Sequence, residues 1–145
     1  MFLGRFDHTI DEKGRVTIPA RFRELLESGG YLTQGFDKNL VVIPAPAFEQ
    51  MFLRITALSL TDPAARLLRR MVFTPAARLE FDRAGRILIP PSLRESAQLK
   101  ENAVIAGTGD GFEIWSAELW GTQEERLQDS KQLEEGFKHL DLSLR

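Results

Sequence analysis

The chain has 145 residues, of which 43% are hydrophobic and 28% are charged, and its formal net charge is −2. This composition is ordinary for a globular protein and argues against disorder. The absence of cysteine excludes disulfides and thiolate metal sites. No apolar run approaches the ~20 residues of a membrane helix and no export signal opens the chain, which predicts a cytoplasmic protein with no membrane partner.

The charge is unevenly distributed along the chain. Residues 1–75 carry ten Lys and Arg against eight Asp and Glu, whereas residues 76–145 carry nine against thirteen. The acidic total argues against a nucleic-acid partner, but DNA binding depends on a local basic surface. The total charge is therefore weak counter-evidence only.

The first half is typical of two strand pairs around a short helix. Apolar and polar positions alternate as in half-buried strands, Pro19 favours entry into a helix of about two turns, and Gly29 follows that helix. The predicted elements are strands at 5–10 and 15–18, joined by a tight turn at 11–14, a helix at 20–28, and strands at 31–36 and 39–44.

Helical segments follow each half, and the second half repeats the order of the first. The predicted elements are helices at 46–58 and 61–73, strands at 78–81 and 86–90, a helix at 91–97, and strands at 103–107 and 112–115. Ser116 can cap a last helix, which is expected to run from Ala117 past Leu133 before the end frays. These longer helices are the expected packing and assembly elements.

The segments DEKGRVTIPARFRE (11–24) and DRAGRILIPPSLRE (82–95) are two copies of one pattern, identical at seven of fourteen positions. Each half is therefore ββαββ, and the fold class is α+β, mainly β. A half of about 70 residues buries only a thin core, so the copies are expected to pack on each other. The predicted parts are a first repeat at 5–47, a helical connector at 48–75, a second repeat at 76–119, and a C-terminal helix and tail at 120–145.

Asp11 and Gly14, like Asp82 and Gly85, have the residue types that build tight turns. An Asp side chain can accept hydrogen bonds from following backbone amides, and Gly takes a positive φ without strain. We therefore interpret these four residues as turn-forming.

Arg15 and Arg86 differ, because turn geometry does not require Arg and yet it recurs at the same place, with Lys13 and Arg83 close by. Paired guanidiniums suit bidentate contact with phosphates or guanine edges. A solvated strand residue is the other interpretation, and spacing alone leaves both open.

Other motifs have structural explanations. Arg23 recurs as Arg94, each followed by Glu, which favours an ion pair. The glycine-rich segment 106–111 is followed by a strand and not by a helix, which favours a hairpin turn over a nucleotide loop. His8 is expected on the apolar face of the first strand.

No catalytic or metal-binding constellation is evident, so we predict no enzyme activity, metal, cofactor or small-molecule substrate.

The duplicated ββαββ unit with D-x-x-G-R resembles the SpoVT/AbrB-type swapped-hairpin DNA-binding domain. A chain of this length with two such units in tandem, which begins with MFLGRFDHTIDEKGRVTIP, resembles the MraZ family of bacterial transcriptional regulators. The resemblance implies one pseudo-two-fold swapped-hairpin barrel with flanking helices, and assembly into a homo-oligomeric ring. It also implies repression of the protein's own cell-division and cell-wall operon, in the nucleoid, through short G-rich direct repeats in double-stranded promoter DNA.

The same resemblance implies DNA contacts at Arg15 and Arg86, with Lys13 and Arg83 as neighbouring basic residues. One departure is that the second copy has Ala84 where the first has Lys13. The two turns are therefore not equivalent in charge.

Two other functions stay open at this point. The chain could be an antitoxin-like or adaptor protein that binds another protein through its helices. An enzyme function stays open only because carboxylates such as Asp11 and Glu12 have no assigned role.

Overall fold

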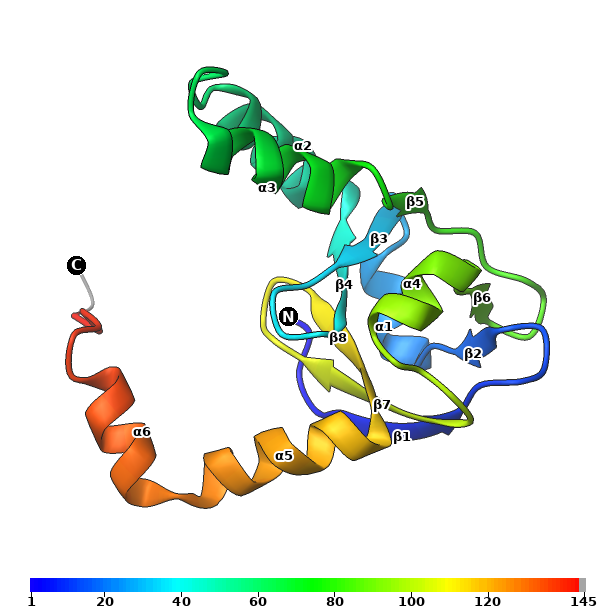
Figure 1. The fold of residues 1–145 in the computed structure, drawn as a ribbon. Coiled ribbons are helices and arrows are strands. Elements are labelled where there is room, and N and C mark those ends of the chain that lie inside the picture. The colour runs from blue at the N-terminus through cyan, green and yellow to red at the C-terminus, as the bar shows by residue number, and fades with distance from the viewer. Residues whose placement is uncertain (144–145) are drawn as a thin grey trace.

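The computed structural model describes residues 1–143 and confirms the two ββαββ repeats. The first repeat consists of β1 (Arg5–Thr9), β2 (Arg15–Thr17), α1 (Ala20–Leu25), β3 (Gly30–Gln34) and β4 (Leu40–Pro44). The second consists of β5 (Ala77–Arg78), β6 (Arg86–Leu88), α4 (Pro91–Ser96), β7 (Asn102–Gly107) and β8 (Phe112–Ser116) (Figure 1). Pro19 and Pro90 occupy the N-cap positions of α1 and α4, where their fixed φ directs the chain into the helix.

The strands of the two repeats interleave. Six of them form an antiparallel sheet in the order β1-β7-β8-β4-β3-β5, while β2 pairs with β6 in a separate two-stranded ribbon. The first strand of each repeat thus pairs with the third strand of the other, β1 with β7 and β5 with β3. This exchange gives the α+β fold its pseudo-two-fold arrangement.

The second strand pair predicted in each repeat forms, as β3–β4 and β7–β8. The first pair of each repeat is largely absent, and that prediction was wrong. The chain reverses at 11–14, but β1 and β2 meet only at the bridge between Ile10 and Val16. Val16 instead lies opposite Ile87 of the other repeat, and both are buried. Exchange places these side chains in a shared core, whereas an isolated hairpin is marginal in water.

The second repeat departs further from the first. The strand predicted at 78–81 is reduced to β5, and Leu79 and Phe81 pack against the core outside any strand. Within residues 1–143 the backbone ladders leave β1 and β5 as sheet edges, so they do not close the expected barrel.

One apolar core joins the repeats. Phe22 of α1 is fully buried, and its ring lies 5.0–5.3 Å from the ring centroids of Phe2, Phe6 and Phe112. Leu93, the equivalent of Phe22 in α4, is buried in the same core. Since Phe112 comes from the second repeat, neither half completes this core alone.

Two helices between the repeats form a projecting hairpin, α2 (Ala45–Thr56) and α3 (Pro63–Phe73) (Figure 1). Asp62 caps α3 by accepting a hydrogen bond from the Ala64 amide at 2.9 Å. Phe48, Ile55 and Val72 form a second, smaller apolar cluster that packs the hairpin against Tyr31 of β3 and Ile43 of β4.

The single C-terminal helix predicted from Ala117 past Leu133 is wrong, because the chain forms α5 (Ala117–Gln128) and α6 (Ser130–Phe137). Asp129 between them is extended, and its side chain accepts a hydrogen bond from the Gln132 amide at 3.2 Å. Asp caps a new helix more favourably than it sits inside one. Residues 138–143 are not helical, and the last two residues of the expected tail lie outside the described ones.

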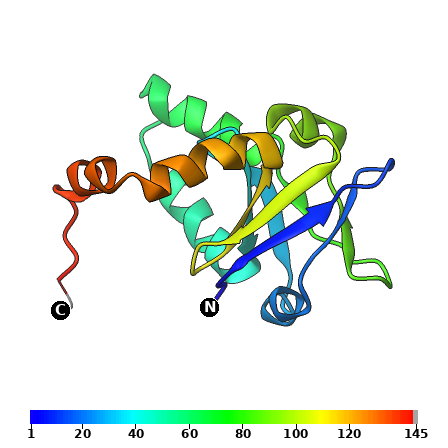
Figure 2. The ribbon, with the colours of Figure 1, turned by 90° about the horizontal axis from the view of Figure 1, so that it is seen from below.

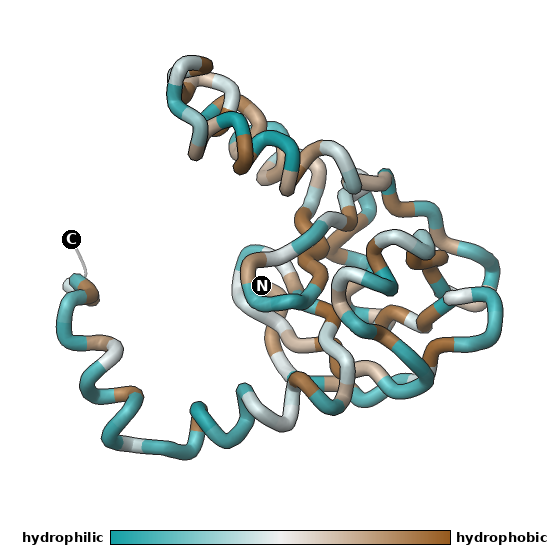
Figure 3. The backbone as a smooth tube through the Cα atoms, in the orientation of Figure 1, coloured by the Kyte–Doolittle hydropathy of each residue, from teal (hydrophilic) through white to brown (hydrophobic). Residues whose placement is uncertain are grey.

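The two helical arms keep large apolar side chains exposed. On the α2–α3 hairpin and its loop these are Phe52, Leu53, Leu58, Leu60 and Leu67, and on the C-terminal segment they are Leu127, Phe137, Leu140 and Leu142. Figure 2 shows α5 and α6 running away from the body on the side opposite the turns before β2 and β6. Figure 3 shows that α5 and α6 are mainly hydrophilic, with isolated apolar positions. Within residues 1–143 no helix is both long and apolar enough to cross a membrane.

Candidate nucleic-acid interface

The turn before β2 is built by the side chain of Asp11. Its Oδ1 accepts hydrogen bonds from the backbone amides of Lys13 (3.0 Å) and Arg15 (2.9 Å). Gly14 has a φ of +84° and donates to the Asp11 carbonyl at 2.9 Å. The backbone is therefore fixed by a carboxylate and by the one residue type that adopts this φ without strain.

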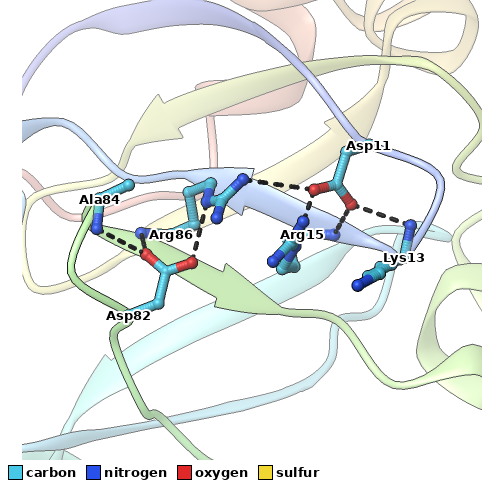
Figure 4. A network of polar contacts seen from close by, with 6 residues as sticks. All are labelled: Asp11, Lys13, Arg15, Asp82, Ala84 and Arg86. Carbon is cyan, nitrogen blue, oxygen red and sulfur yellow. Dashed lines mark hydrogen bonds and ion pairs between the residues drawn. The ribbon is translucent and has the colours of Figure 1, made fainter.

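The turn before β6 repeats this geometry. Asp82 Oδ1 accepts from the amides of Ala84 and Arg86, both at 2.9 Å, and Gly85 has a φ of +75° (Figure 4). Because β2 and β6 pair antiparallel, the two turns flank opposite ends of this short ribbon, and both lie on the same side of the molecule (Figures 2 and 4).

The arginines are tied to the same carboxylates. Arg15 Nε donates to Asp11 Oδ2 at 2.7 Å, and Arg86 Nε donates to Asp82 Oδ2 at 2.8 Å. A longer contact of 3.5 Å joins Arg86 Nη1 to Asp11 Oδ2 across the repeats. The view that local structure does not involve the arginines is therefore wrong. Both side chains remain about one-third exposed.

Arg15 and Arg86 lie on the outer face of the β2–β6 ribbon. The register places Arg15 opposite Leu88 and Thr17 opposite Arg86, while Val16 and Ile87 between them face the core. Directly opposite residues on paired strands share a face. The outer face thus carries two guanidiniums, one from each repeat.

Arg23 and Arg94 each support the turn of the other repeat. Arg94 Nε donates to the Ile89 carbonyl at 3.0 Å, and its guanidinium lies over Gly14, where an added Cβ would be 2.6 Å from Arg94 Cζ. Arg23 donates to the Ile18 carbonyl and lies over Gly85 in the same way. The ion pair expected for Arg23 with its following Glu is not formed, so that prediction was wrong.

Two backbone hydrogen bonds reinforce this exchange. The Ile18 amide donates to the Gly85 carbonyl at 3.0 Å, and the Ile89 amide donates to the Gly14 carbonyl at 2.8 Å. Each turn is therefore anchored to the strand of the other repeat.

The glycine-rich segment 106–111 forms a hairpin turn, as expected. It joins the antiparallel strands β7 and β8, and Thr108 donates to the Gly111 carbonyl at 3.0 Å. His8 is half-buried on β1. Within residues 1–143 no three His, Cys, Asp or Glu side chains are grouped as a metal site requires.

Comparison with known proteins identifies the family. The family described as "MraZ protein, putative antitoxin-like" matches residues 1–71 and again residues 72–141. The chain belongs to the MraZ family. It is 50% identical over 122 residues to a protein named transcriptional regulator MraZ from Herpetosiphon aurantiacus, covering 84% of this chain and 85% of the relative.

Two further relatives carry the same name. One from Thermomicrobium roseum is 50% identical over 127 residues, covering 88% of this chain and 89% of the relative. One from Leuconostoc mesenteroides is 40% identical over 143 residues, covering 98% and 100%. All three relatives are named as transcriptional regulators, which agrees with the prediction that this chain is not an enzyme.

The two turns of this MraZ-family chain differ in charge. The first presents Glu12 and Lys13 where the second presents Arg83 and Ala84, and all four are exposed. Lys13 and Arg83 have no side-chain hydrogen bond or ion pair within residues 1–143. Both basic groups are thus free to meet an anionic partner at the tips.

The backbone amide of Arg15 has the largest effect on Asp11 and lowers its pKa below the ordinary value. Burial opposes this shift, and the Arg15 guanidinium lowers the pKa further. The amide and guanidinium of Arg86 lower the pKa of Asp82 in the same way. Both carboxylates therefore stay ionised below the pH at which they would be protonated in the unfolded chain.

This shift predicts a pH dependence of stability. As pH falls below about 4, the unfolded chain takes up protons first, so the contribution of the two carboxylates to the free energy of unfolding is lost. Urea unfolding between pH 3 and 6 should show a steeper acid loss for the wild type than for the Asp11→Asn/Asp82→Asn variant, since Asn retains an acceptor for the turn. Equal pH dependence would contradict the role given to these carboxylates.

Sequence reasoning missed Arg23, Arg94, Thr17 and Leu88 as parts of this site. Arg23 and Arg94 follow Gly14 and Gly85 by the same nine residues, which was a usable signal of a shared task. Nothing in the sequence indicated that each would contact the turn of the other repeat.

Proposed function

We propose that the chain is a sequence-specific DNA-binding transcriptional regulator that meets DNA with the outer face of the β2–β6 ribbon. The observation that carries this proposal is the pair of guanidiniums on that face, each held by a turn carboxylate. Its MraZ relatives are named as transcriptional regulators, which supports the same function.

The way the arginines are held suits base recognition. A carboxylate on Nε leaves the Nη groups of Arg15 to donate to a ligand, and it leaves Nη2 of Arg86, whose Nη1 has the longer contact with Asp11. A guanidinium already fixed in direction loses less conformational freedom on binding. A two-stranded ribbon fits the major groove, where Arg donates to guanine O6 and N7. Arg15 and Arg86 are therefore proposed to read guanines.

Lys13 and Arg83 are proposed to contact phosphates beside the arginines. Their exposed position at the turn tips suits an electrostatic role that carries no sequence information. The acidic C-terminal arm runs from the opposite side of the body, which reduces its repulsion of DNA (Figure 2).

The finer role is repression of the protein's own cell-division and cell-wall operon in the cytoplasmic nucleoid, through direct repeats bound by a ring of copies. One pair of reading arginines gives modest affinity, whereas linked copies raise avidity by about 10² to 10⁴. The exposed apolar residues of the two arms suit contacts between copies, since closed symmetry would bury them.

If copies of the chain assemble through the arms, a charged residue introduced on α3 should weaken the assembly. Leu67→Glu should shift the protein from a large oligomer to smaller species in light scattering, because a carboxylate would be buried in the contact. Leu88→Thr changes a similarly exposed leucine on the ribbon, and it should leave the mass unchanged. A monomeric wild type, or an unchanged mass for Leu67→Glu, would contradict this use of α3.

The proposed function is tested by binding to the DNA just upstream of the gene across a salt series. Phosphate contacts should give a linear fall of log affinity with log salt, and base contacts should give a preference over scrambled DNA. Tight co-purification of a small toxin with no affinity for that DNA would favour the antitoxin-like function instead.

A further inference from the structure

The two reading arginines have different neighbours. Arg15 lies directly opposite Leu88, and Arg86 lies directly opposite Thr17. Because Leu88 and Thr17 occupy equivalent positions of the two repeats, the pseudo-two-fold axis relates one pair to the other. The two guanidiniums on the outer face are therefore related by the pseudo-two-fold axis, but the residue beside one is leucine and the residue beside the other is threonine.

Leu88 is unusual at this place. Its side chain is 58% exposed on the outer face of a ribbon whose inner face is fully buried by Val16 and Ile87. It belongs to neither apolar cluster of the fold. Its strand, β6, lies away from the two helical arms, which carry most of the other exposed large apolar side chains (Figures 1 and 2). The leucine thus contributes nothing to the core, and Thr at the equivalent position meets the same structural demands.

We infer that Leu88 and Thr17 are specificity-determining residues, which make the two halves of the ribbon read different base pairs next to their guanines. This inference rests on the proposed function. Leucine offers only apolar contact, which in the major groove selects the 5-methyl group of thymine, whereas threonine can donate to or accept from any base edge. The Arg15–Leu88 pair selects a guanine beside a thymine, and the Arg86–Thr17 pair is permissive at the neighbouring base.

The register makes this assignment geometrically coherent. Opposite residues on paired antiparallel strands have Cβ atoms about 4.5–5.5 Å apart, so both members of a pair can reach adjacent base pairs, which are stacked about 3.4 Å apart. The two pairs are also unequal in their nearest turn, since Lys13 precedes Arg15 and Arg83 precedes Arg86 at a different spacing. One subunit therefore presents an oriented, non-palindromic reading surface, which suits direct repeats.

Replacement of thymine by deoxyuridine tests this directly, because it removes the methyl group alone. Duplexes of the upstream DNA, each with one thymine replaced, would be titrated with the full-length wild type and with Leu88→Ser, which has no methyl group to contact thymine. At one or more positions the wild type should lose about fourfold in affinity, as expected for one buried methyl group, and Leu88→Ser should bind both duplexes equally. Thr17→Leu should gain sensitivity at a second set of positions.

The inference is overturned if no thymine position affects the wild type, or if Leu88→Ser remains as sensitive as the wild type. These outcomes differ from a failure of the proposed function. If the wild type prefers the upstream DNA and Arg15→Ala reduces that preference, the function stands even when deoxyuridine has no effect. If the wild type shows no preference over scrambled DNA, both fall together.

Discussion

Joint replacement of Arg15 and Arg86 with Ala is expected to abolish the preference for operator over scrambled DNA. Each guanidinium is oriented by a carboxylate on the exposed ribbon face, so each is available for one bidentate contact with guanine. Such a contact discriminates between bases by about 5- to 150-fold, and the two single variants should each lose a factor of this size. Competition binding at fixed salt measures it.

A matched control separates base reading from general charge. Arg126→Ala on α5 removes the same charge from an exposed side chain far from the ribbon, and it should leave the preference unchanged. The double variant should remain folded, because both arginines are on the surface and Val16 and Ile87 still pair beneath them. Wild-type preference in the folded double variant would contradict the site.

The second large effect is expected for Gly85→Ala. A non-glycine residue in a left-handed conformation costs about 1–2 kcal/mol. At Gly85, where φ is +75°, the added Cβ would also lie 2.4 Å from Arg23 Nη1. Displacing that guanidinium breaks its bond to the Ile18 carbonyl, which adds about 1.5–3 kcal/mol for a charged donor.

Gly109→Ala is the matched control for Gly85→Ala. Its φ is +94°, but nothing lies within 4 Å of an added Cβ, so it should lose only the conformational part of the free energy of unfolding. Urea unfolding of the two variants should therefore differ by the contribution of Arg23. Gly14→Ala should resemble Gly85→Ala through Arg94. Equal losses at Gly109 and Gly85 would contradict the contact between repeats.

The repeats and most elements could be predicted because their signals are local. Alternation marks the strands, and Pro19 and Pro90 mark helix entries. The break at Asp129 was missed because the same residues also fit a continuous helix, and only the capping bond to Gln132 decides between them.

The pairing of strands could not be predicted from local pattern. Val16 satisfies a local hairpin and an exchanged ribbon equally well, since both bury the same face of β2, and only the shared core with Ile87 favours exchange. The same limit explains the wrong partner expected for Arg23, whose contact at Gly85 exists only because the repeats exchange. The exchange of strands between the repeats was predicted from the resemblance to the MraZ family and not from the residues alone.

We propose that the turns before β2 and β6 face DNA. Because the chain has no cysteine, Ala84→Cys on the second turn would carry the only thiol, to which a photoactivatable cross-linker can be attached. Ser59→Cys, at the far end of the α2–α3 hairpin, is the matched control (Figure 1). Irradiation with upstream DNA should cross-link the Ala84→Cys protein efficiently and the Ser59→Cys protein weakly. Equal or reversed cross-linking would contradict the account.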